Sequence, residues 1–99
     1  MTQEQIIISR MRTAVRKYAE EALNLHPDYV EKFARFGANI MAKKWDLIPG
    51  QYLSGFEDAI VNNDLFSTFA KADDDNRILV PYYVIMWNSM SFPTKELVV

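Results

Sequence analysis

The chain has 99 residues, of which 49% are hydrophobic and 24% are charged, and its formal net charge is −2. This length supports one core and one domain, 1–99, and the composition argues against disorder. The absence of cysteine excludes disulfides, a thiolate nucleophile and thiolate metal sites, and it suits a reducing compartment. The first residues lack the basic start and long apolar stretch of a signal peptide, so we expect a cytoplasmic protein.

A first amphipathic helix is predicted over residues 3–24. Thr2 and Gln5 have the spacing of a capping box, which would start this helix. Apolar residues then recur at alternating spacings of three and four, which is the period of one helix face. These residues are Ile8, Met11, Val15, Tyr18, Ala22 and Leu25. The helix is expected to end before His26, because a residue that precedes proline avoids the α region.

A second helix is predicted over residues 28–45. Pro27 suits the first helical position, and Asp28 suits the positive end of the helix dipole. A strip of small residues runs along this helix: Ala34, Gly37, Ala38 and Ala42. Small side chains let a neighbouring helix approach closely. We therefore expect the first and second helices to form a long antiparallel pair.

Two shorter helices are predicted over 51–61 and 65–72, after a Pro-Gly turn at 46–50. The Asn and Asp residues at 62–64 separate these helices and can cap the second of them. Residues 73–76 have the sequence Asp-Asp-Asp-Asn. They are expected to form a solvated acidic turn that also supplies the N-cap of the last helix.

The run from Ile78 to Trp87 contains no charge and no side-chain amide. Its ten residues are too few to span a bilayer, which takes about 20 residues. A strand here would lack partners, so a helix over 79–90 with Pro81 in its first turn is favoured. The predicted fold class is all-α, a single small domain of four to five helices packed around this apolar C-terminal helix. Residues 1–2 and 95–99 are expected to be frayed.

The sequence contains no recognisable catalytic constellation, and we predict a protein that is not an enzyme and holds no cofactor or metal. His26 is the single histidine and is expected to cap a helix end. The acidic residues at 73–76 lack the alternating ligands, central glycine and distal glutamate of a calcium loop. No glycine-rich loop is present that could cradle a phosphate.

Four cations lie close together in the first helix: Arg10, Arg12, Arg16 and Lys17. One interpretation is a nucleic-acid-binding face that contacts phosphates. The other is a solvated helix face on which Arg16 pairs with Glu20 and Lys17 pairs with Glu21, four residues further on. Nucleic-acid binding is therefore kept as the alternative function.

Aromatic and methionine residues are concentrated in the second half of the chain, and they can be core residues or interface residues. If a few short helices are not enough to enclose all of these side chains, some of the side chains form a surface patch. We predict a non-enzymatic protein-protein interaction module, of the accessory, inhibitor or assembly-factor class known in bacteria and phages. Its partner is another protein or a second copy in a homodimer. The predicted partner-binding residues are Tyr52, Phe66, Tyr82, Tyr83 and Trp87.

Overall fold

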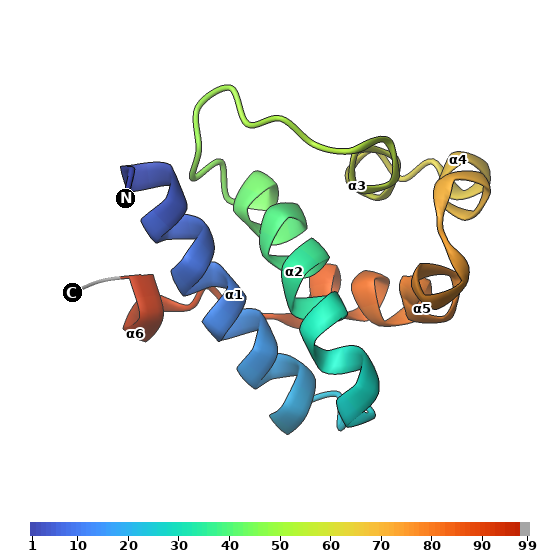
Figure 1. Cartoon of the computed structure of the whole chain (residues 1–99), viewed down its shortest axis with the longest axis horizontal. Helices are drawn as coiled ribbons and strands as arrows, with labels where there is room; N and C mark the ends of the chain where they lie inside the picture. The colour runs from blue at the N-terminus through green and yellow to red at the C-terminus, as the bar shows by residue number, and fades with distance from the viewer. Residues whose placement is uncertain (98–99) are drawn as a thin grey trace.

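The computed structural model describes residues 1–97, and these residues form helices and connecting segments without any strand (Figure 1). The helices are α1 (Gln3–Glu21), α2 (Pro27–Lys44), α3 (Gly55–Val61), α4 (Leu65–Lys71), α5 (Asp74–Ser89) and α6 (Thr94–Leu97). The prediction of one small all-helical domain is confirmed, with six helices in the described part of the chain. Of the tail that was expected to be frayed, Thr94–Leu97 is helical, and residues 98–99 lie outside the described residues.

Local capping starts the first two helices as the sequence predicts. The Gln5 backbone N–H donates to Thr2 Oγ1 over 3.2 Å, and the Thr2 backbone N–H donates to Gln5 Oε1 over 2.8 Å. At the start of α2, the Asp28 backbone N–H donates to His26 Nδ1 over 3.1 Å. His26 is therefore the N-cap of α2, and its predicted capping role is confirmed.

The central element of the fold is α2, which packs against α1, α3 and α5. Its strip of small residues makes this possible. A Cβ atom added to Gly37 would lie 2.8 Å from Val15 Cγ1 of α1 and 3.1 Å from Met86 Cε of α5. The sequence predicted the close approach of α1 to α2, but it assigned the centre of the fold to the C-terminal helix rather than to α2.

The helix that carries the apolar run, α5, is buried along one face only. Leu79, Val80, Tyr83 and Met86 are its buried apolar residues. The opposite face is in contact with solvent, as the burial pattern between Ile78 and Ser89 shows. In Figure 1, α5 runs from the right-hand end of the molecule to a position behind α2, and α2, α3 and α4 contact its inner face.

The boundaries of α3 and α5 differ from the predicted ones. Asp73 is the N-cap of α5, because the Asn76 backbone N–H donates to Asp73 Oδ1 over 2.9 Å. The helix thus begins at residue 74 rather than 79, and Pro81 lies in its interior, where it offers no N–H to the carbonyl of Arg77. Ser54 caps α3, so that helix begins after residue 54 and not at 51.

The C-terminal ends of α2 and α5 are also linked to each other. Lys44 near the end of α2 donates from Nζ to the backbone carbonyl of Trp87, and its ammonium lies 5.4 Å from the centre of the Trp87 ring. This contact satisfies one of the free carbonyls in the last turn of α5. Within residues 1–97, no helix is both long and apolar enough to cross a membrane.

Candidate interaction surface

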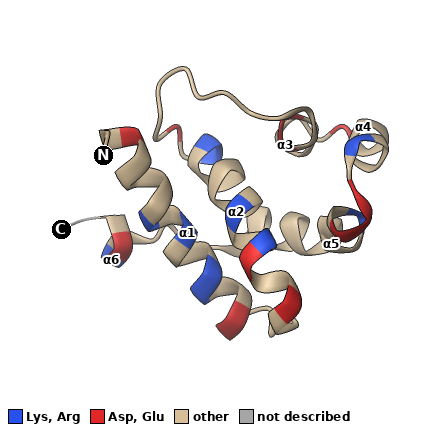
Figure 2. Ribbon diagram, viewed as in Figure 1, with Lys and Arg blue, Asp and Glu red and all other residues tan. Residues whose placement is uncertain are grey.

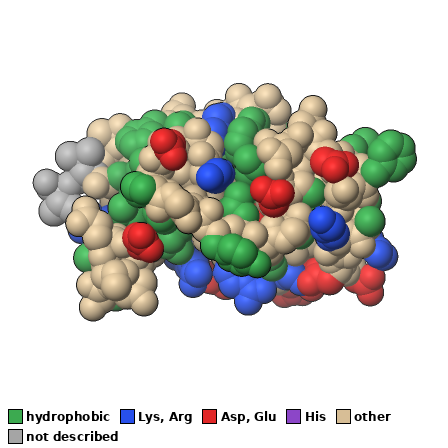
Figure 3. Space-filling model, turned by 90° about the horizontal axis from the view of Figure 1, so that it is seen from above, with side chains coloured by type: hydrophobic (Ala, Val, Ile, Leu, Met, Phe, Trp, Pro, Cys, Tyr) green, Lys and Arg blue, Asp and Glu red, His purple; other side chains and the backbone are tan. Residues whose placement is uncertain are grey.

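Large apolar side chains are exposed on the outer sides of α4 and α5. We call this set the α4–α5 apolar surface: Leu65, Phe66, Phe69, Ile78, Val84 and Ile85. Phe66 is 89% exposed, and the three α5 residues Ile78, Val84 and Ile85 are 52%, 48% and 46% exposed. Hydrophobic atoms protrude at the right-hand end of Figure 3, where α4 lies. Within residues 1–97, nothing covers the exposed parts of these side chains.

The two helices are joined at this surface. The Arg77 side chain of α5 donates from Nε to the backbone carbonyl of Phe69 in α4 over 3.4 Å. On the adjacent side, a groove of ≈ 330 Å³ separates the end of α3 from the middle of α5. Its lining residues are Ile60, Val61, Asn63, Val84, Trp87 and Asn88. The exposed residues of α5 therefore continue into an apolar groove that contains the half-buried Trp87 ring.

The five predicted partner-binding residues lie in three different environments. Tyr52 and Phe66 are almost fully exposed, at 90% and 89%. Tyr82 and Trp87 on α5 are half-buried at the edge of the core. Tyr83 is fully buried, so it belongs to the core and cannot form part of an exposed patch. Tyr52 lies on the segment between α2 and α3, apart from the α4–α5 apolar surface.

The environment of Tyr83 explains this correction. Its ring stacks on Phe33 of α2 with 4.7 Å between the ring centres, and its hydroxyl donates to Asn76 Oδ1 over 2.9 Å. Phe56 of α3 meets the same ring edge-on at 5.8 Å. Burial raises the pKa of the Tyr83 hydroxyl well above its ordinary value, with a smaller contribution from the charge of Asp73. Tyr83 therefore remains neutral and joins α2, α3 and α5.

The structure does not collect the four predicted cations on one face. Arg16 pairs with Glu31 of α2, with 2.6 Å from Nε to Oε1, whereas Lys17 lies 3.9 Å from Glu96 of α6. Arg12 precedes Arg16 by four residues, so it lies on the same side of α1. There it lines a cavity beside the segment between α2 and α3. Arg10 precedes Lys17 by seven residues, which is two helical turns, and so lies on the side of Lys17.

The surroundings of these cations are of mixed charge. The hydrogen bond with Glu31 raises the pKa of Arg16, and the same bond lowers the pKa of the Glu31 carboxyl. The expected pairs of Arg16 with Glu20 and of Lys17 with Glu21 do not form ion pairs within residues 1–97, because the two cations reach α2 and α6 instead. Figure 2 shows the basic positions of α1 grouped between acidic positions at its two ends, with further acidic positions in the first half of α2.

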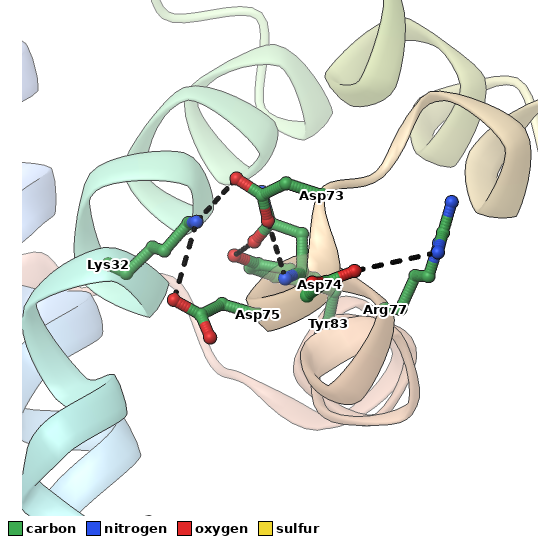
Figure 4. Close-up of polar contacts among 7 residues, drawn as sticks. Lys32, Asp73, Asp74, Asp75, Arg77 and Tyr83 are labelled. Carbon is green, nitrogen blue, oxygen red and sulfur yellow. Dashed lines mark hydrogen bonds and ion pairs between the residues drawn. The ribbon is translucent and has the colours of Figure 1, made fainter.

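The acidic segment at the start of α5 is neutralised by protein groups rather than arranged around an open site (Figure 4). Lys32 of α2 lies 2.5 Å from Asp73 Oδ2 and 3.7 Å from Asp75 Oδ2. Asp74 points away from them and lies 3.6 Å from Arg77 Nη1. The Lys32 bond and the helix cap lower the pKa of Asp73. Across residues 1–97, no three His, Cys, Asp or Glu side chains are grouped so that they could hold a metal ion.

Sequence reasoning missed the exposed aliphatic residues of α5, because it assigned the open part of the apolar run to its aromatic residues. The available signal was the spacing of Ile78, Pro81 and Ile85, which places them on one side of a helix opposite Leu79 and Tyr83. It also missed the cavity beside Arg12, which depends on contacts between distant segments.

Comparison of the chain with protein-family models, with curated proteins and with solved structures found no match.

Proposed function

We propose that this protein is a non-enzymatic protein-binding module that docks its partner on the α4–α5 apolar surface. The observation that carries the proposal is the exposure of that surface, in particular of Phe66 at 89% and of Ile78 at 52%. Single exposed apolar residues are common on protein surfaces, but groups of large ones mark interaction sites. A role as an accessory, inhibitor or assembly factor fits such a module.

The exposed side of α5 suits a protein surface better than a charged ligand. Between Ile78 and Ser89, every exposed residue is uncharged. Ile78, Pro81 and Ile85 share one side of the helix, and Val84 lies beside them. Burying this side against another protein would remove apolar area from water, which stabilises a complex by about 25 cal/mol for each Å². Polar contacts with the partner would lie at the rim of the buried area.

A second copy of the chain is the first partner that we propose. Two α5 helices can pair in antiparallel fashion about a two-fold axis near Pro81. Ile78 of one copy would then face Ile85 of the other, and the same contact would occur twice. The outer side of α5 contributes no charges to this pairing, so association should not weaken as salt is added. Binding to nucleic-acid phosphates, in contrast, weakens steeply with salt.

The test is the molar mass in solution, measured by size-exclusion chromatography with light scattering from low to high micromolar concentration. We expect a concentration-dependent dimer for the wild type and a monomer for Ile85→Asp, which places a charge in the contact. Tyr52→Ser is the control, because it removes an equally exposed aromatic ring outside α4 and α5 and should leave the dimer intact. A wild type that stays monomeric at high micromolar concentration refutes the homodimer.

Binding to a different protein is tested separately, by comparing what the wild type and the Ile85→Asp variant retain from an extract of the source cell. The proposal predicts a protein that is retained by the wild type and by Tyr52→Ser but lost with Ile85→Asp. If the chain is monomeric and all three proteins retain the same set, the α4–α5 apolar surface is not a docking surface.

A further inference from the structure

A second and separate feature of the molecule is a cavity of ≈ 570 Å³ between the first half of α1 and the segment that follows α2. One wall consists of Glu4, Gln5, Ile8, Ser9 and Arg12 of α1, and the other contains Asn39 and residues 48–52. Cavities of about 300–1,000 Å³ with an apolar lining and a few polar groups are typical of small-ligand sites. This cavity is remote from α4 and α5 in the fold (Figure 1).

Two residues that line this cavity each carry a buried polar atom without a hydrogen-bond partner among the described residues: Arg12 Nε, a donor, and Gln51 Oε1, an acceptor. The orientation of the Gln51 amide is fixed, because its Nε2 donates to the backbone carbonyl of Asn39 over 2.9 Å. The carbonyl can only accept, so Oε1 must be the free atom. A buried polar group without a partner costs about 1–3 kcal/mol, which a ligand with complementary groups would recover.

The α1 wall of the cavity has a defined order of charge. Glu4, Ile8 and Arg12 are four residues apart and form one row along the helix, so a negative, an apolar and a positive group follow one another. Eight residues of helix place the Cα atoms of Glu4 and Arg12 about 12 Å apart. Neither Glu4 nor Arg12 forms an ion pair with another of the residues 1–97. Neither charge is held by a direct ion pair, although the Arg12 charge also helps to lower the pKa of the Glu31 carboxyl.

We propose that this cavity binds a short zwitterionic peptide of about three residues with an apolar central side chain. Three extended residues span about 10 Å, which is close to the spacing of the Glu4 and Arg12 Cα atoms along the helix. The peptide ammonium would lie at Glu4 and its carboxylate at Arg12, where charge-assisted hydrogen bonds are strongest. A peptide N–H would donate to Gln51 Oε1, and the central side chain would contact Ile8 and Ile48.

The test uses the tripeptide Gly-Leu-Gly as the probe and isothermal titration calorimetry on the whole chain. We expect saturable binding at millimolar peptide, and Arg12→Gln and Glu4→Gln should each weaken it by about tenfold or more, as the loss of a charged hydrogen bond does. Acetylation of the peptide N-terminus should weaken binding as much as Glu4→Gln does. Amidation of its C-terminus should weaken binding as much as Arg12→Gln does. Glu4 is exposed, so its variant keeps the fold even if the Arg12 variant does not.

Arg10→Gln is the matched control. It removes the same charge from the same helix two residues away, but Arg10 does not line the cavity, so affinity should change by less than about twofold. The absence of binding at millimolar peptide overturns the proposal. So does equal affinity for the free and the doubly blocked peptide, or an equal loss in the Arg10 and Arg12 variants. The Ile85→Asp variant should bind the probe normally, so this test and the test of the α4–α5 apolar surface can fail independently.

Discussion

The ring of Tyr83 on α5 stacks on the ring of Phe33 on α2, with 4.7 Å between the ring centres and 10° between their planes. Both side chains are fully buried. This contact holds α5 against α2 by its inner face, and a helix held by one face leaves its other face in solvent. The core contact thus explains why Ile78 and Ile85 of the same helix are exposed.

The hydroxyl of Tyr83 should contribute to stability independently of the stacked ring. Tyr83→Phe keeps the ring but leaves Asn76 Oδ1 buried without its donor, since Asn76 is also buried. We expect the free energy of unfolding to fall by about 1–3 kcal/mol, measured by urea denaturation. Tyr52→Phe, at an exposed hydroxyl, should have no measurable effect. Equal stability of both variants and the wild type would show that the Tyr83–Asn76 bond is not a net stabilising contact.

Gly37 should be intolerant of even one added methyl group. Alanine in mid-helix is intrinsically favourable by about 1 kcal/mol relative to glycine. Here the added Cβ would lie 2.8 Å from Val15 Cγ1 and 3.1 Å from Met86, so α1 or α5 must move. We expect Gly37→Ala to destabilise the protein by about 1–3 kcal/mol, the range for overpacked cores, as measured by thermal and urea unfolding.

The matched control for Gly37→Ala is Gly55→Ala, in the first turn of α3. There the added Cβ would meet only the flexible Lys71 side chain, 3.1 Å away at Cδ. The side chain can move at little cost, so stability should stay within about 0.5 kcal/mol of the wild type. A Gly37→Ala variant that is more stable than the wild type would contradict the close packing of the three helices.

The first half of the fold could be predicted from the sequence because its signals are local. A capping box at Thr2, the periodic stripe of α1 and a small residue at Gly37 each act within one helix or on its immediate neighbour. The second half could not be predicted as well. The acidic segment was expected to supply the N-cap of the last helix, and Asp73 does so, but the helix itself was expected to begin at residue 79. Pro81 was therefore placed one helical turn or more too near the start.

The candidate sites depend on contacts between segments distant in the sequence. Adjacent tyrosines must point in different directions, but the sequence does not say which of Tyr82 and Tyr83 meets Phe33. Arg12 and Gln51 line one cavity only because the segment after α2 passes beside α1. No local pattern predicts that arrangement. The exposed side of α5 was predictable in principle from helical spacing, once the extent of the helix is known.

Asp73 should make stability depend on pH in the acid range. Its pKa is lowered in the folded protein, first by the Lys32 bond and second by the Asn76 backbone N–H. The stabilising contribution is therefore fully present above the unfolded-state pKa of about 3.9 and is lost as the pH falls through the lower folded-state value. Asp73→Asn can still cap α5 but carries no charge, so its free energy of unfolding should fall less as the pH is lowered. Urea denaturation at a series of pH values measures this.

The cap and the charge of Asp73 can be separated by a second substitution. Asp73→Ala removes both, so at neutral pH it should be less stable than Asp73→Asn by about 1 kcal/mol, the usual contribution of an N-cap. Lys32→Met should reproduce the larger part of the pH effect of Asp73→Asn without affecting the cap, because the Asn76 backbone N–H still lowers the pKa of Asp73. If Asp73→Asn retains the acid-side slope of the wild type, the Lys32–Asp73 pair does not control it.

A substitution on the buried face of α5 should mainly lower stability, whereas one on the exposed face should mainly weaken self-association. Leu79→Ala removes a fully buried side chain and should lower the free energy of unfolding by about 2–5 kcal/mol. Ile85→Ala truncates a side chain that is 46% exposed and should cost about 1 kcal/mol or less at low micromolar protein concentration. In the light-scattering experiment the order should reverse, because only Ile85 belongs to the proposed contact: Ile85→Ala should weaken self-association, whereas folded Leu79→Ala should retain it. Equal loss of association in both variants would mean that dimer formation follows the stability of α5 and does not use its exposed face.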